Sequence, residues 1–246
     1  MKSGPGEIEM ADIARRDMLT MAGAVGVGVA IPVSPAAAEA LPKDKVQGSP
    51  ATSAPARSYQ FFDLNEAAFI EAFVDHLVPA DELSPSGTEL GITIYIDRQL
   101  AGAWGRGARM YLLGPWAAGT SQQGYQLPLA PADLYRCAIR AVEAHCETVH
   151  GGSFDRLQPA QRQKIVQALS DGSLPLQEIP ARVFFDMAYA NVMEGLFADP
   201  IYGGNKDKRG WRLVGFPGVM AAHAENIERF RGKPYPVEPL GIADLS

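Results

Sequence analysis

Apolar residues at helical spacing dominate the chain from residue 61 onward. The segment that starts at Leu64 repeats them every three or four residues until Pro79 ends it. Asp63, with Glu66 three positions later, fits a capping box at the start of this helix. No segment shows two alternating runs joined by a tight turn, which is the pattern of a β-hairpin. The sequence therefore predicts one irregular all-α domain of about six to seven helices.

The other predicted helices follow from the same spacing and from the turn residues at their ends. Pro131 suits the first position of a helix, and Gly151 suits the position just after one. Residues 92–96 have strand propensity, but their apolar side chains also line one helical face, so we interpret them as helical. The predicted helices after the first cover residues 90–103, 106–113, 131–150, 159–170, 180–197 and 218–229.

Two long segments mix glycine and proline with aromatic residues, and we expect both to be ordered loops. Residues 114–130 form the first, and residues 199–218 form the second. Glycine and asparagine allow the backbone angles of tight turns, whereas a flexible linker would not carry several aromatic rings. Compact loops of this length are usually functional, so the 199–218 loop is the candidate site.

The N-terminal segment has the layout of an export signal. Arg15 and Arg16 precede a stretch rich in Gly, Ala and Val, and small residues then offer cleavage after Ala38 or Ala40. Paired arginines are typical of the twin-arginine route, which exports folded proteins. A retained membrane anchor is the alternative, although prolines interrupt the apolar stretch.

These features divide the chain into four parts. We expect a twin-arginine signal at 1–38, a disordered Pro/Ser/Thr-containing linker at 39–60, the helical domain at 61–232 and a Pro-rich tail at 233–246. The formal net charge is −6 with no basic run, which argues against nucleic acid as a partner.

No set of residues with a catalytic, cofactor-binding or metal-binding spacing stands out. The chain lacks a nucleophile elbow, a phosphate loop, a dinucleotide fingerprint and the Cys-x-x-Cys-His motif of covalent haem. Cys137 and Cys146 fall on opposite faces of one predicted helix, about 13 Å apart along its axis, so we expect two buried thiols rather than a disulfide. Cys146 and His150 share a helix face, but no further ligands have a useful spacing.

The chain resembles the gluconate 2-dehydrogenase small (gamma) subunit family, subunit 3 of membrane-associated flavin-dependent sugar dehydrogenases. The resemblance covers residues 60–220 and rests mainly on the 199–218 loop. The other segments that carry it are Arg15-Arg16, the helix end Phe69…Leu77-Val78-Pro79-Ala80 and Ile96-Asp97-Arg98-Gln99-Leu100.

The resemblance implies a three-part periplasmic enzyme that oxidises CH–OH groups of sugars or polyols. Its large subunit would hold FAD, its second subunit would be a multihaem cytochrome c, and the small subunit would have no redox centre. The small subunit would supply the twin-arginine signal, and the complex would sit at the inner membrane. Because FAD is loaded in the cytoplasm, export of a folded pair would explain this type of signal.

The resemblance and the residues together predict that the 199–218 loop docks onto the flavoprotein. Its aromatic rings would either meet the partner or fill the domain's own core, and the sequence leaves both open. A free-standing periplasmic enzyme or small-molecule binder is the main alternative, and a protein that merely reuses the fold is a third. The predicted contacts are Asp199, Pro200, Tyr202, Gly203, Gly204, Asn205, Lys206, Arg209, Trp211 and Phe216, with Trp104, Trp116 and Tyr125 behind them.

Overall fold

The structure is a computed structural model that describes residues 58–245 except 118, 121, 178 and 220–223. The predicted signal and nearly all of the predicted linker lie outside the described residues. Within this part of the chain the protein is all-α, as predicted, with no strand. No helix in the described ranges is both long and apolar enough to cross a membrane.

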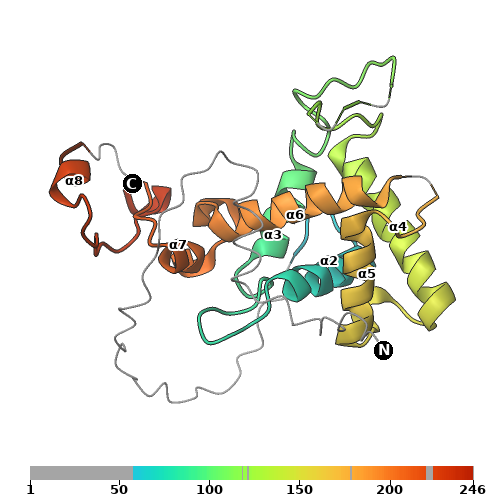
Figure 1. Cartoon of the computed structure of the whole chain (residues 1–246), viewed down its shortest axis with the longest axis horizontal. Helices are drawn as coiled ribbons and strands as arrows, with labels where there is room; N and C mark the ends of the chain where they lie inside the picture. The colour runs from blue at the N-terminus through green and yellow to red at the C-terminus, as the bar shows by residue number, and fades with distance from the viewer. Residues whose placement is uncertain (1–57, 118, 121, 178, 220–223, 246) are drawn as a thin grey trace, which may run out of the picture. The chain divides into compact units, whose positions relative to one another are not determined.

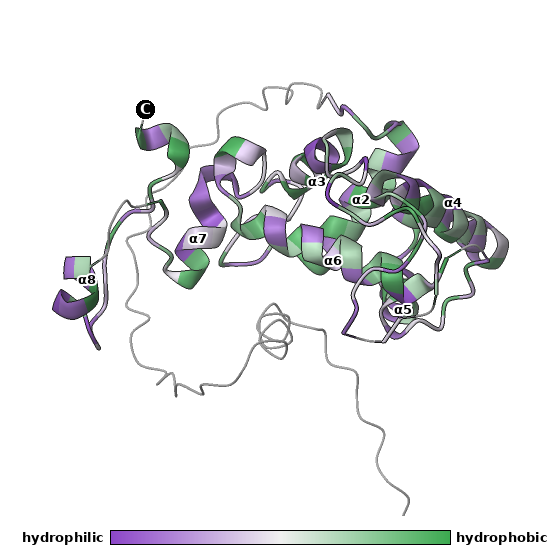
Figure 2. Ribbon diagram, turned by 90° about the horizontal axis from the view of Figure 1, so that it is seen from above, coloured by the Kyte–Doolittle hydropathy of each residue, from purple (hydrophilic) through white to green (hydrophobic). Residues whose placement is uncertain are grey.

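The described residues contain seven α-helices and several 3-10 turns, joined by loops (Figure 1). Helix α6 is central to the packing, because it contacts α3, α4, α5 and α7. Each of the longer helices shows apolar and polar residues in alternation along its ribbon, as amphipathic helices do (Figure 2). The α-helices are α2 (Leu64–Leu77), α3 (Ile92–Ala101), α4 (Pro131–His150), α5 (Pro159–Asp171), α6 (Ala181–Phe197), α7 (Arg209–Val214) and α8 (Ala224–Arg229).

The predicted capping box at the start of α2 is confirmed. The Asp63 carboxylate accepts hydrogen bonds from the backbone N–H groups of Asn65 and Glu66, at 2.8 and 2.9 Å. The Glu66 carboxylate accepts one in return from the Asp63 N–H, at 3.1 Å. These bonds satisfy donors that have no partner inside the helix, which fixes where α2 begins.

The core is built around aromatic rings from several helices. Phe73 of α2 lies 6.3 Å from Phe184 of α6 between ring centroids, and Tyr135 of α4 meets the same Phe184 edge-on at 5.5 Å. Phe69 of α2 packs 4.8 Å from Phe154 in the turn between α4 and α5. All five rings are almost completely buried, so burial of their surface contributes strongly to stability.

Two predicted helices differ from the structure. Residues 106–113 form turns rather than a helix, with left-handed backbone at Gly107 and Arg109 that interrupts any helical run. The predicted helix at 218–229 is described only from Ala224 to Arg229, and residues 220–223 lie outside the described part. Gly218 instead lies in a parallel β-bridge with Leu240. The backbone groups on either side of Gly218 are hydrogen-bonded to Leu240 and not to a helix.

A buried carboxylate holds the point where the chain enters the domain. Asp97 of α3 is 1% exposed and accepts hydrogen bonds from the backbone N–H groups of Gln60, Phe61 and Phe62, at 2.8, 2.9 and 3.0 Å. Arg136 of α4 reinforces this segment by lying 4.6 Å over the Phe61 ring. The first described residues are therefore fixed to α3 and α4.

Replacing Asp97 with alanine should lower the free energy of unfolding by about 2–4 kcal/mol, because three backbone donors lose a charged acceptor. Urea unfolding of the purified protein would measure this. Asp186→Ala is the matched control, since Asp186 is exposed and pairs only with Arg182 one turn away, so we expect a change within about 0.5 kcal/mol. Equal stability of Asp97→Ala and wild type would contradict this role.

Candidate docking surface

The 199–218 loop is more helical than the sequence predicted. It contains 3-10 turns at Pro200–Tyr202 and Lys206–Lys208, followed directly by α7. Gly215, in a left-handed conformation, ends α7. The loop is thus a series of short turns followed by a short helix. It is ordered, as the sequence predicted, but the interpretation of the whole segment as a loop without helix needs correction.

Asn205 organises the centre of the loop. It is completely buried, and its side-chain amide donates to the Ala198 carbonyl at 2.8 Å while its amide oxygen accepts from the Gly210 N–H at 2.7 Å. Its backbone φ is +48°, a left-handed conformation that asparagine tolerates better than most residues. One side chain therefore joins the end of α6 to the start of α7.

Glycines allow the loop to lie directly on α6. A Cβ atom at Gly204 would overlap the carbonyl oxygen of Gly195, and one at Gly210 would overlap that of Leu196. No larger residue fits at either place without moving the backbone of α6. Gly204, predicted as a docking contact, is buried and lies against α6.

The loop aromatics divide into one core residue and two surface residues. Trp211 is 4% exposed, and its indole N–H donates to the Phe197 carbonyl at 2.7 Å. Phe216 meets the Trp211 ring edge-on at 5.3 Å but stays 45% exposed, and Tyr202 is 51% exposed. Trp211 therefore fills the domain's own core, while Tyr202 and Phe216 remain available to a partner.

The polar residues of the loop divide in the same way. Lys206 and Arg209 are exposed. Asp199 is buried, and its carboxylate accepts from the Ile201 N–H at 3.0 Å and from the Ile242 N–H at 2.8 Å. Asp199 is therefore part of the internal structure of the loop, whereas the two cations face solvent.

The C-terminal tail packs against the loop, a contact that the sequence did not predict. Besides the bond from Ile242 to Asp199, Leu240 exchanges backbone hydrogen bonds with Pro217 and Val219, at 3.1 and 2.7 Å. Two ion pairs join the same segments: Lys208 with Asp244, and Arg212 with Glu238. The tail thus forms part of the surface that the loop presents.

Two of the three aromatic residues expected behind the loop, Trp116 and Tyr125, are not brought to it. Trp116 lies in the 114–130 loop, where its ring is 6.4 Å from that of Tyr111. Tyr125 donates its hydroxyl proton to the Leu129 carbonyl of the same segment. This segment extends from the junction of α3 and α4, away from α7 (Figure 1). The two loops therefore form separate surfaces.

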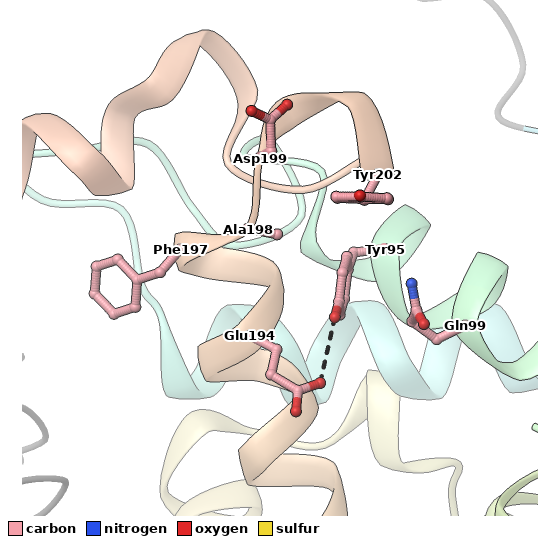
Figure 3. A pocket seen from close by; sticks show the side chains of 7 residues that line it. All are labelled: Tyr95, Gln99, Glu194, Phe197, Ala198, Asp199 and Tyr202. Atoms are coloured by element: carbon pink, nitrogen blue, oxygen red, sulfur yellow. Dashed lines mark hydrogen bonds between the residues drawn. The ribbon is translucent and has the colours of Figure 1, made fainter. Parts of the chain in front are cut away.

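An open pocket of about 450 Å³ lies beside the 199–218 loop (Figure 3). Tyr95 and Gln99 enter it from α3, Glu194 from α6 and Tyr202 from the loop. The Tyr95 hydroxyl donates to the Glu194 carboxylate at 3.3 Å. Burial, and then the charge of Glu194, raise the pKa of Tyr95 to about 12, so this hydroxyl keeps its proton at neutral pH.

A buried network supports Glu194 from the side of the core. The Asn191 side-chain amide donates to the Glu194 carboxylate at 3.0 Å, and the buried Tyr135 hydroxyl donates to the Asn191 amide oxygen at 2.8 Å. Burial raises the pKa of Tyr135 well above its usual value, which keeps it a donor. Sequence reasoning missed Glu194 and Tyr95 as pocket residues, because they lie 99 positions apart. The sequence did place Asn191 and Glu194 three positions apart on one face of a predicted helix, and this was the only hint of a polar network there.

The cysteines form no disulfide with each other, as predicted, but they differ in burial. Cys146 is completely buried, and burial raises its thiol pKa to about 12. The expectation that Cys137 is also buried is wrong: it is half-exposed, because its face of α4 borders a shallow groove near Leu176. In the described ranges no three His, Cys, Asp or Glu side chains are grouped to hold a metal ion.

The family model for gluconate 2-dehydrogenase subunit 3 matches residues 65–218, well over half of the chain. The chain belongs to this family. The match runs from the first turn of α2 to the end of the 199–218 loop, so it includes α3 to α7 and this loop but not the C-terminal tail. Membership supports an accessory subunit of a dehydrogenase complex. Comparisons with curated proteins and with solved structures gave no significant match.

Proposed function

We propose that this chain is the non-catalytic small subunit of a periplasmic, flavin-dependent dehydrogenase that acts on a sugar or sugar acid. It carries the twin-arginine signal under which an FAD-containing large subunit crosses the membrane, and it stabilises that subunit. A multihaem cytochrome c is the third component, and the assembled complex lies at the inner membrane. FAD and haem belong to the partners in this proposal.

The observation that carries the proposal is the family match through Gly218. Two features of the chain support it independently. Arg15 and Arg16 provide the paired arginines of the export route. The 199–218 loop is held rigid by its own buried Asn205 and Trp211, yet exposes Tyr202, Phe216 and Arg209. A preformed surface with exposed aromatic and Arg side chains is typical of protein interfaces.

Deletion of the gene in the native host tests the proposal. We expect the flavoprotein to be absent from the periplasm or inactive there, and expression of the full chain in trans to restore the activity. The measurement is dye-linked dehydrogenase activity in the periplasmic and membrane fractions, together with the amount of flavoprotein in each fraction. Unchanged periplasmic activity in the deletion strain would contradict the proposal.

A further inference from the structure

The pocket beside the docking loop is lined by two tyrosine rings and by the exposed carboxylate of Glu194. The Tyr95 side chain lies between Glu194 and the Tyr202 ring, with Gln99 at the side (Figure 3). Tyr202 is half-exposed, which puts the pocket on the surface that the loop presents. A ligand that enters this pocket would meet a carboxylate and two rings at once.

Some of the polar groups that line the pocket have no partner within the described part of the chain. In the described part of the protein, Glu194 makes no ion pair, and the Gln99 amide and the Tyr202 hydroxyl make no hydrogen bond. Asn191 and Tyr95 hold the Glu194 carboxylate in one orientation through two hydrogen bonds. The carboxylate is therefore fixed in place but lacks a cation.

We propose that this pocket receives an arginine side chain of the flavoprotein large subunit. The guanidinium pairs with Glu194, stacks on the exposed ring of Tyr202 beside Tyr95, and donates to the Gln99 amide oxygen. A planar guanidinium suits this arrangement better than an ammonium group, because it binds a carboxylate through two parallel bonds and also stacks on aromatic faces. The inference rests on the proposed function and names the chemistry of the contact.

The support behind Glu194 explains why the contact would be selective. Tyr135 and Asn191 link the carboxylate to the core, so the acid does not have to reorganise when the cation arrives. When one member of an interfacial charge pair is removed, the main effect is a faster dissociation of the complex, and the association rate changes less. A neutral side chain from the partner would leave Glu194 without a counter-ion in a pocket that the interface closes.

The test is Glu194→Gln in the full chain, with association to the purified flavoprotein followed by surface-based binding kinetics. We expect affinity to fall by about tenfold to a hundredfold. The wild-type affinity should decrease as salt increases, and the variant should lose most of this dependence. Glu147→Gln is the matched control, because Glu147 is an exposed acid on α4 outside the pocket.

A second pair of variants separates the ring from its hydroxyl. Tyr202→Ala should weaken association by about fivefold or more, whereas Tyr202→Phe should leave it close to wild type, since stacking needs only the ring. The Tyr202 side chain is half-exposed, so thermal unfolding of both variants should be nearly unchanged and serves as the folding check.

The outcomes distinguish the inference from the proposed function. Wild-type affinity and salt dependence in Glu194→Gln and Tyr202→Ala, with a complex that still forms, would overturn the arginine contact alone. Binding of gluconate to the isolated chain through Glu194, with unchanged assembly, would also overturn it. Failure of the wild-type chain to bind the flavoprotein at all would overturn the proposed function itself.

Discussion

Replacing Arg15 and Arg16 together with lysine should leave the dehydrogenase without activity in the periplasm. Lysine keeps both positive charges, so the change removes the arginine pair that the proposed export route would need while leaving the charge of the segment as it is. The flavoprotein would then accumulate in the cytoplasm together with this chain. Immunoblots of the cell fractions, combined with a dye-linked activity assay, measure the result.

The control for this experiment lies in the same segment. Glu7→Gln with Glu9→Gln changes two charges near the pair but leaves Arg15 and Arg16 intact, and we expect normal export. Wild-type periplasmic activity in the double-lysine variant would mean that the chain does not direct twin-arginine export. In that case the accessory role would have to rest on docking alone.

Replacing Asn205 with alanine should destabilise the domain by roughly 3–5 kcal/mol and abolish docking. The Ala198 carbonyl and the Gly210 N–H would both lose their partner in a buried position. Alanine would also have to adopt the left-handed conformation at φ +48°, which costs about 1–2 kcal/mol. Urea unfolding gives the stability, and binding kinetics with the flavoprotein give the docking.

Two further variants show where the effect comes from. Asn205→Asp keeps the acceptor for Gly210 but places an oxygen against the Ala198 carbonyl, so it should also destabilise the domain. Lys206→Ala changes an exposed neighbour and should stay within about 0.5 kcal/mol of wild type. A loss below about 1 kcal/mol for Asn205→Ala would mean that Asn205 does not hold the loop together.

The parts of the fold that the sequence predicted depend on local signals. The start of α2 was readable because Asp63 and Glu66 interact across one turn. Likewise, Pro131 at the beginning of α4 and Gly151 at its end act on their immediate neighbours. The order of the 199–218 loop was also predictable, since its glycines and aromatic rings lie close together in the chain.

The parts that the sequence did not predict depend on contacts between distant segments. Asp97 binds backbone groups some 35 positions earlier, and nothing near it in the sequence indicates this role. The contact of Ile242 with Asp199 joins the tail to the loop across 43 positions. Residues 106–113 were mispredicted because Arg109 adopts left-handed backbone, which its residue type does not suggest.

The loop aromatics show the same limit at the candidate site. Trp211 and Phe216 are both aromatic residues of the loop, but Trp211 donates its indole N–H to a carbonyl of α6 and is buried, whereas Phe216 has no such donor and stays exposed. The buried members, Asn205 and Trp211, shape the loop. Tyr202, Phe216, Lys206 and Arg209 stay exposed, so in the proposed function the residues that dock differ from those that stabilise the loop.

Isolation of the chain from native periplasm tests the accessory-subunit account most directly. A C-terminal affinity tag on the full-length chain would be used under mild salt, and the eluate would be examined for flavin absorbance and for its protein components. The account predicts a yellow complex that contains an FAD flavoprotein in equal amount to this chain and shows dye-linked dehydrogenase activity. A colourless eluate that contains this chain alone, from cells that make the flavoprotein, would contradict it.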